Sequence, residues 1–246
     1  MNNPLRRFPL VKKVEALLDQ GADKNSREFG DHGDPVLIRI CRHGHFTLGK
    51  LLIERNADIN LPSTFPNGGI FTTALMATAG HCWELRYSEG QDFSADFFNL
   101  ACLLIEKDAD VHARNLGGST ALIETSFFLE PFRHSQASTI LRLGLIRLLL
   151  ERKADVNAAN EIGYTPLIVA CMCGSYEGAE LLIENGADVN KRALDKKAFA
   201  AFRTSNGGLP FDPIYETALS AAHAHEDTDP AKAKLIHLLE QRGAIE

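Results

Sequence analysis

The sequence lacks the long apolar segments that mark export or membrane insertion. Residues 1–10 contain no apolar core of signal-peptide length, and no stretch approaches the roughly 20 apolar residues of a membrane span. Positive charge is not in excess either, because the net charge is −6. Basic surfaces serve binding to nucleic acids and anionic lipids. We therefore expect neither nucleic acid nor membrane as a partner, and a cytoplasmic location.

Cysteine is scarce, and its number is odd. Such a set favours reduced core thiols over a disulfide framework. The five cysteines stand inside apolar segments, at Cys41, Cys82, Cys102, Cys171 and Cys173.

The motifs of common enzyme classes are also missing. There is no Gly-rich phosphate loop, zinc-spaced Cys/His set or nucleophile elbow. Cys171-x-Cys173 has the wrong spacing for zinc or redox chemistry, and His223-x-His225 precedes a charged loop. The sequence therefore predicts a non-catalytic chain with no cofactor and no bound metal.

What the sequence does contain is an internal repeat. Several aliphatic residues, a charged residue and then Ala-Asp-x-Asn recur, in the segments 17–25, 51–60, 103–112 (with His112 in place of Asn), 148–157 and 181–190. A more divergent copy lies at 238–246. A second phrase of the type Thr-x-Leu precedes the later copies, at 73–79, 120–126, 165–171 and 217–223, while Pro35 holds the Thr position of the segment 35–41. Self-similarity at this spacing indicates stacked repeats.

Each phrase has a local structural meaning. Thr is a good N-cap, and Pro is tolerated at the first helical position. The aliphatic run ends a second helix, which a residue in the left-handed conformation terminates. Asp-x-Asn then turns the chain into a hairpin. The unit is helix, turn, helix and hairpin, and it must stack on its neighbours to bury its apolar face.

These phrases resemble the ankyrin repeat family over nearly the whole chain. The segment 158–190 matches best, at Gly163, Thr165, Pro166, Leu167, Ala170, Gly174, Leu181, Leu182, Gly186, Ala187, Asp188 and Asn190. The resemblance implies an all-α solenoid of about six repeats, with the first and last truncated. The resemblance also implies that Gly44-His45 is the family's ordinary turn. Cys41, His43 and His45 are therefore not expected to bind a metal ion together.

The chain departs from the family at two kinds of position. The family's His after Thr-Pro-Leu is replaced throughout, by Ile38, Met76, Ile123, Ile168 and Ser220. We expect apolar packing to replace most of its hydrogen bonds. The terminating Gly is replaced by Asn56, Asp108 and Lys153. Because lysine carries a Cβ, Lys153 in this left-handed conformation should lower the stability of the fold by about 1 kcal/mol.

The repeat spacing defines a single domain over 1–246 with six parts. They are a capping half repeat (1–25, with its helix over about 9–20), repeats at 26–60, 61–112, 113–157 and 158–190, and a C-terminal repeat at 191–246. Insertions lie between the two helices at 80–98 and 127–138, and in the last hairpin at 191–214, where 196–203 suits a short basic helix. The first two are rich in aromatic residues. They are either a satellite core that lengthens the helices or a docking surface.

The resemblance implies a protein-binding function. The partner is expected to bind in the concave groove that hairpin tips and the exposed ends of the first helices form, and at the inserted loops. The corresponding positions are Arg42, His43, Thr72, Arg114, Leu116, Ser119, Phe127, Phe128, Glu161, Ile162, Tyr164, Met172, Cys173, Glu216 and His225. Ile162, Tyr164 and Met172 form the expected hot spot, because apolar and aromatic anchors carry most interface energy.

Other functions stay open at this point. They are an obligate scaffold subunit, a bacterial effector, a toxin-immunity protein and an enzyme built from the insertions. The segment around Asn157 also resembles a site of Asn hydroxylation, although it is equally an ordinary turn. We expect the chain alone to be monomeric, with another protein as its partner.

Overall fold

The computed structural model describes residues 4–27, 33–64, 70–80, 94–127, 136–194, 215–224 and 230–245. Contacts divide the chain into two compact units, Met1–Leu116 (unit 1) and Gly117–Glu246 (unit 2). The proposed Lys196–Arg203 helix, most of the two aromatic insertions and most of the 191–214 insertion lie outside the described residues. The repeat boundaries and the single array over 1–246 remain predictions.

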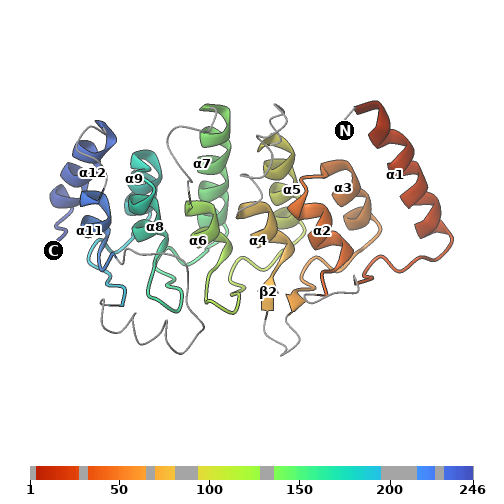
Figure 1. The fold of residues 1–246 in the computed structure, drawn as a ribbon, viewed down its shortest axis with the longest axis horizontal. Helices are drawn as coiled ribbons and strands as arrows, with labels where there is room; N and C mark the ends of the chain where they lie inside the picture. Colours follow the sequence, from red (N-terminus) through yellow and green to blue (C-terminus); the bar gives the residue numbers. More distant parts are fainter. Residues whose placement is uncertain are drawn as a thin grey trace. The chain divides into compact units, whose positions relative to one another are not determined.

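Unit 1 is built from pairs of helices. Its elements are α1 (Pro4–Asp19), α2 (Val36–Arg42), α3 (Phe46–Glu54), β1 (Ser63–Thr64), β2 (Ile70–Thr72), α4 (Ala74–Ala79) and α5 (Ser94–Glu106). The first helices of two pairs, α2 and α4, pack on each other, and the second helices α3 and α5 do the same. α1 is a second helix that packs on α3 (Figure 1).

Unit 2 repeats the arrangement. Its elements are α6 (Ala121–Ser126), α7 (Gln136–Glu151), α8 (Pro166–Met172), α9 (Tyr176–Glu184), α11 (Ala218–His223) and α12 (Pro230–Gln241). The first helix α8 packs between α6 and α11, and the second helix α9 packs on both α7 and α12. The predicted helical repeat solenoid is therefore the observed fold.

The first helices begin as the Thr phrase predicts. The hydroxyl oxygens of Thr73, Thr120, Thr165 and Thr217 each accept a hydrogen bond from the backbone N–H three residues on. Such a cap contributes about 1 kcal/mol to helix stability. Pro166 occupies the first turn of α8, where its missing N–H costs no hydrogen bond.

Apolar packing replaces the family's His, as expected. Ile38, Ile123 and Ile168 are at most 1% exposed, and Met76 is 3% exposed. At the same position of α11, Ser220 is polar rather than apolar. Its hydroxyl accepts a hydrogen bond from the Thr217 N–H and completes a capping box.

Second helices end in the same left-handed turn. Asn56, Asp108 and Lys153 have φ of 58°, 64° and 65°, and glycines hold the equivalent place in the other copies, as at Gly186 with φ 89°. In each turn the next residue's N–H donates to a carbonyl five residues back, as Ala154 does to Leu149 at 2.9 Å. This is the Schellman arrangement, which satisfies carbonyls that the helix end leaves open.

The Asp-x-Asn phrase forms the predicted turn. An Asp carboxylate accepts from the N–H two residues on, as Asp155 does from Asn157 at 2.9 Å, and Asp23, Asp58, Asp110 and Asp188 do likewise. Among the described segments, paired strands occur at β1–β2, in the antiparallel register Ser63 opposite Thr72.

The Asn of the phrase also links one repeat to the next, which the sequence analysis did not foresee. The Asn157 carboxamide oxygen accepts from the Asp188 N–H at 2.8 Å, and its nitrogen donates to the Gly186 carbonyl at 3.1 Å. Asn60 binds Asp110 and Asp108, and Asn190 binds Ile245 and Gly243, in the same way. Each carbonyl that accepts belongs to the left-handed residue of the following copy.

The interhelical insertions lengthen the second helices. α5 and α7 have 13 and 16 residues, whereas α3 and α9 have 9. Phe97, predicted to lie in the first insertion, is part of α5 and only 1% exposed. A Cβ added to Gly44 would lie 2.8 Å from its ring. For Phe97, therefore, the satellite-core interpretation is confirmed.

The N-terminal helix begins earlier than predicted. It starts at Pro4 rather than near residue 9, so that Pro9 stands inside it. Glu15 and Asp19 pair with Arg55 of the next repeat at 3.1 and 2.6 Å. Leu10 and Leu17 of this helix are 49% and 47% exposed.

Lys153→Gly should stabilise unit 2 by about 0.5–1 kcal/mol, because glycine adopts a positive φ without the steric cost that a Cβ brings. Urea denaturation followed by circular dichroism measures the change. The matched reverse variant, Gly186→Lys, should destabilise by a similar amount, since its position has space but also a positive φ. Equal stability of Lys153→Gly and the wild type would show that the left-handed turn stores no strain.

Asn157→Ala should lower the free energy of unfolding of unit 2 by about 1–2 kcal/mol, because it removes both inter-repeat hydrogen bonds. The control is Asn185→Ala, whose amide donates within its own helix end, to the Leu181 carbonyl at 2.8 Å. Urea midpoints of the two variants provide the comparison. If Asn185→Ala lowers the free energy of unfolding as much as Asn157→Ala does, the inter-repeat hydrogen bonds contribute no more than a bond within one helix end.

Candidate functional site

In unit 1 the predicted binding residues surround the end of α2. Arg42 closes α2, and its Nε lies 3.2 Å from the Asp34 carboxylate. Its guanidinium also lies over the Phe71 ring, 4.9 Å from the centroid. The Asp34 carboxylate in turn accepts a hydrogen bond from the Ser63 hydroxyl. Arg42 is therefore fixed by structural contacts that tie α2 to the β1–β2 hairpin.

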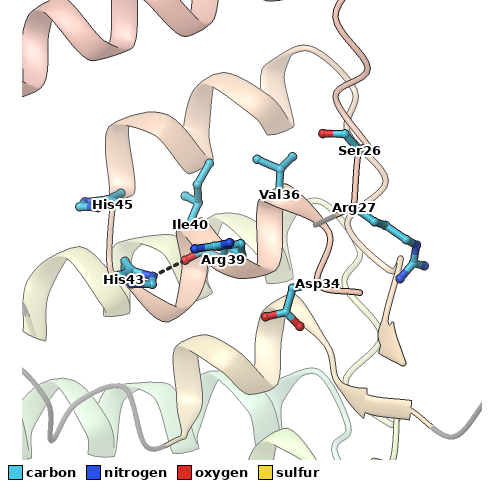
Figure 2. A pocket seen from close by; sticks show the side chains of 8 residues that line it. All are labelled: Ser26, Arg27, Asp34, Val36, Arg39, Ile40, His43 and His45. Carbon is cyan, nitrogen blue, oxygen red and sulfur yellow. Dashed lines mark hydrogen bonds between the residues drawn. The ribbon is translucent and has the colours of Figure 1, made fainter. Parts of the chain in front are cut away.

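The other predicted residues of unit 1 are more exposed. His43 is exposed at the end of α2, and its Nδ1 lies 2.8 Å from the Arg39 carbonyl (Figure 2). Arg114 is exposed and Leu116 is 50% exposed, both among the last residues of the unit. Thr72, at the end of β2, is half-buried. These positions offer accessible surface, and their role in binding remains a prediction.

In unit 2 the hairpin tips are joined into one ledge. The Glu161 N–H donates to the Gly117 carbonyl at 2.9 Å, and the Ile162 carbonyl accepts from the Leu194 N–H at 2.9 Å. The central tip is held by its own bonds, because the Asn160 side chain accepts from the Tyr164 N–H at 2.8 Å. We name residues 117–119, 160–164 and 193–194 the tip ledge. Backbone hydrogen bonds thus fix the positions of the predicted residues Glu161 and Ile162.

Two glycines permit this close approach. A Cβ at Gly118 would lie 3.0 Å from the Glu161 nitrogen, and one at Gly163 would lie 2.6 Å from the Cα of Ala193. Both glycines also have a positive φ. Larger residues would therefore push the tips of successive repeats apart.

Tyr164 is held inside this framework rather than presented to solvent. It is 7% exposed, and its hydroxyl oxygen accepts from the Tyr215 N–H at 3.4 Å. Burial raises the pKa of the Tyr164 hydroxyl. The tyrosine therefore offers a partner little surface, and Tyr164→Ala would disturb the packing as well as any binding.

The other two members of the expected hot spot retain accessible surface. Ile162 lies in the tip ledge and Met172 at the end of α8, and both are half-buried. Cys173, the C-cap of α8, is also half-buried. A half-buried apolar side chain in a fixed backbone is suited to anchor a partner at low entropic cost.

The remaining predicted residues have mixed surroundings. Ser119 is 8% exposed in the tip ledge, and the carbonyl of the half-buried Glu216 accepts from the Ala193 N–H at 2.9 Å. Phe127 is half-buried at the end of α6. Phe128 and His225 lie outside the described residues. The hydrogen bonds of Asn157 give it a structural role, and its modification remains untested.

A buried arginine that the sequence analysis missed supports Phe127. Arg142 of α7 is 3% exposed, and its Nη1 donates to the Phe127 carbonyl at 2.6 Å. A charged donor is used here to satisfy a carbonyl at a helix end. Arg142 stands three and four residues before the buried Leu145 and Ile146, on the apolar face of α7, and that break in the apolar pattern is the signal that could have revealed it.

The sequence analysis also missed a hollow of about 470 Å³ beside α2. It is lined by Ser26, Arg27, Asp34, Val36, Arg39, Ile40, His43 and His45. Figure 2 shows that Val36, Arg39, Ile40 and His43 come from successive turns of α2 and the residue after it. The His43 and His45 rings are stacked, with centroids 6.0 Å apart.

The described cysteines are reduced and differ in burial. Cys41 and Cys171 are fully buried, and Cys102 and Cys173 are half-buried. Burial strongly raises the pKa of the Cys171 thiol, which suits a core position rather than a nucleophile. Within the described segments, no three His, Cys, Asp or Glu side chains are grouped so as to hold a metal ion.

Comparison with known proteins agrees with the repeated architecture. Residues 93–193 match the family model of ankyrin repeats, in three copies. A search of curated protein sequences finds no match. Among the described helices, none is both long and apolar enough to cross a membrane. The matched segment supports an ankyrin repeat family, and the described helix pairs on both sides of it follow the same capped pattern.

Proposed function

We propose that this chain is a non-catalytic module that binds another protein through the tip ledge of unit 2 and the neighbouring end of α8. Ankyrin repeats are generally protein-interaction modules. The single observation that carries the proposal is the backbone bonding of the tips, from Glu161 to Gly117 and from Ile162 to Leu194. It holds half-exposed side chains in place before a partner arrives.

Pre-ordering favours binding because the entropy of fixing the surface has already been lost on folding. Ile162 and Met172 supply apolar area, and the exposed Glu161 supplies a charge at the rim. This mixture is typical of interfaces, which combine apolar anchors with a polar surround. The reduced thiols suit a reducing compartment, and we place the module in the cytoplasm.

The test compares the double variant Ile162→Ala/Met172→Ala with the wild type. Both proteins are used to capture partners from a lysate of the encoding organism, followed by titration of each purified candidate in a calorimeter. We expect at least one direct partner whose Kd rises about tenfold or more, because two anchors lose apolar contact.

The control is Ile140→Ala, which removes a 61% exposed aliphatic side chain from the second helix α7. It should bind each partner as the wild type does. Circular dichroism melts of all three proteins report whether the fold is kept. Direct partners that bind the double variant with unchanged Kd would refute the ledge as the binding surface.

A further inference from the structure

One turn of unit 2 joins an asparagine directly to a glycine. Asn185 is the C-cap of α9, and Gly186 is the left-handed residue that follows it, with φ 89°. In the part of the chain that the structure describes, no other asparagine precedes a glycine. Two further Asn-Gly pairs, at 67–68 and 206–207, lie outside the described residues. The pair matters chemically, because an asparagine side chain can react with the backbone nitrogen that follows it.

The reaction is a ring closure that releases ammonia. The Gly186 nitrogen loses its proton to solvent and attacks Cγ of Asn185, so that an N–Cγ bond forms. The Cγ–Nδ2 bond breaks, and Nδ2 takes up a proton from solvent and leaves as ammonia. Water then opens the succinimide ring at either carbonyl, which gives aspartate or isoaspartate at position 185. Water is the co-reactant, and nothing is oxidised or reduced.

Both residues of the pair are accessible to this chemistry. Asn185 and Gly186 are exposed, so that solvent surrounds them. A Cβ added to Gly186 would meet no described atom within 4 Å, which leaves open space on that side of the turn. Because glycine has no Cβ, nothing on its own residue shields its nitrogen from the Asn185 side chain. The site therefore has the exposure and the space that ring closure requires.

The folded turn nevertheless holds both reacting groups in hydrogen bonds. The Gly186 N–H donates to the Ile183 carbonyl at 3.0 Å, and Nδ2 of Asn185 donates to the Leu181 carbonyl at 2.8 Å. The N–H must be released before its proton can be lost, and the side chain must leave the Leu181 carbonyl. Ring closure therefore requires a local opening of the helix end.

The bonds of Asn157 restrain that opening. Its Nδ2 donates to the Gly186 carbonyl at 3.1 Å, and its Oδ1 accepts from the Asp188 N–H at 2.8 Å. They tie the reacting turn to a residue 29 positions before Gly186. Because the Gly186 carbonyl has to move when the helix end opens, the opening breaks or strains the bonds of Asn157.

We propose that Asn185 is a deamidation site whose reaction the Asn157 bonds slow, and whose product weakens those bonds. Isoaspartate adds a methylene group to the backbone and displaces the carbonyl that Asn157 binds. Either product places a carboxylate beside Glu184, at a helix end where the macrodipole disfavours negative charge. The lost ammonia does not return, so the change is one-way and accumulates with the age of the molecule. The site is separate from the tip ledge, so that either proposal can fail without the other.

The test follows the full chain in a mildly alkaline buffer, both folded and in urea, because ring closure requires a deprotonated nitrogen. Peptide mass spectrometry quantifies the product at position 185 separately from those of the other Asn-Gly pairs. We expect the folded chain to react about tenfold more slowly than the chain in urea, since the folded turn is open for only a fraction of the time. In urea, Gly186→Ala should slow the reaction about tenfold or more, because a Cβ then shields the nitrogen.

Two variants test the restraint by Asn157. Asn157→Ala should speed the reaction of the folded chain about fivefold, because it removes both bonds to the turn. The matched control is Asn60→Ala, which removes the equivalent bonds to Asp110 and Asp108 in unit 1 and should leave the rate at Asn185 unchanged. In urea both variants should react as fast as the wild type.

Three results would overturn the proposal. Equal rates for the folded and the urea-unfolded wild type would show that the turn protects nothing. Equal rates for the folded wild type and folded Asn157→Ala, or equal acceleration by Asn157→Ala and Asn60→Ala, would show that the Asn157 bonds do not restrain this turn. No product at position 185 in folded Asn157→Ala over about ten half-times of the unfolded chain would show that local opening does not expose the site.

Discussion

The left-handed turn at the end of each second helix is the feature on which the rest of this structure depends. It closes the helix and starts the Asp-x-Asn turn within three residues. It also supplies the carbonyl that the Asn of the preceding copy binds, as Gly186 does for Asn157. One backbone conformation thus sets both the end of a helix and the register of the next repeat. The positive φ of Lys153 shows that this geometry overrides the preference of the residue that occupies it.

The stacking register in turn fixes the backbone of the proposed binding surface. Where repeats are bonded tip to tip, as at Gly117 and Glu161, the backbone of the ledge is fixed before any partner binds. Gly118 and Gly163 permit this close approach, since an added Cβ would lie 3.0 Å from the Glu161 nitrogen and 2.6 Å from the Cα of Ala193. The proposed tip ledge therefore follows from the repeat geometry.

Much of the fold could be predicted from sequence because it rests on local chemistry. A Thr cap, an aliphatic run and an Asp-x-Asn turn each act within a few residues, so Thr165, Lys153 and Asp155 behave as their patterns indicate. The inter-repeat bonds of Asn157 were missed because they join residues about 30 positions apart. The early start of α1 at Pro4 was missed because Pro is typical of a first helical position, whereas Pro9 stands inside the helix.

The candidate surfaces were harder to predict, because exposure is a property of packing and not of residue type. Tyr164 has the composition of an interface anchor, yet its ring is covered and its hydroxyl meets the Tyr215 N–H. Leu17 has the composition of a core residue, yet it is half exposed. Family positions locate the ends of helices and the tips of hairpins correctly, but they do not show which side chains at those places remain accessible.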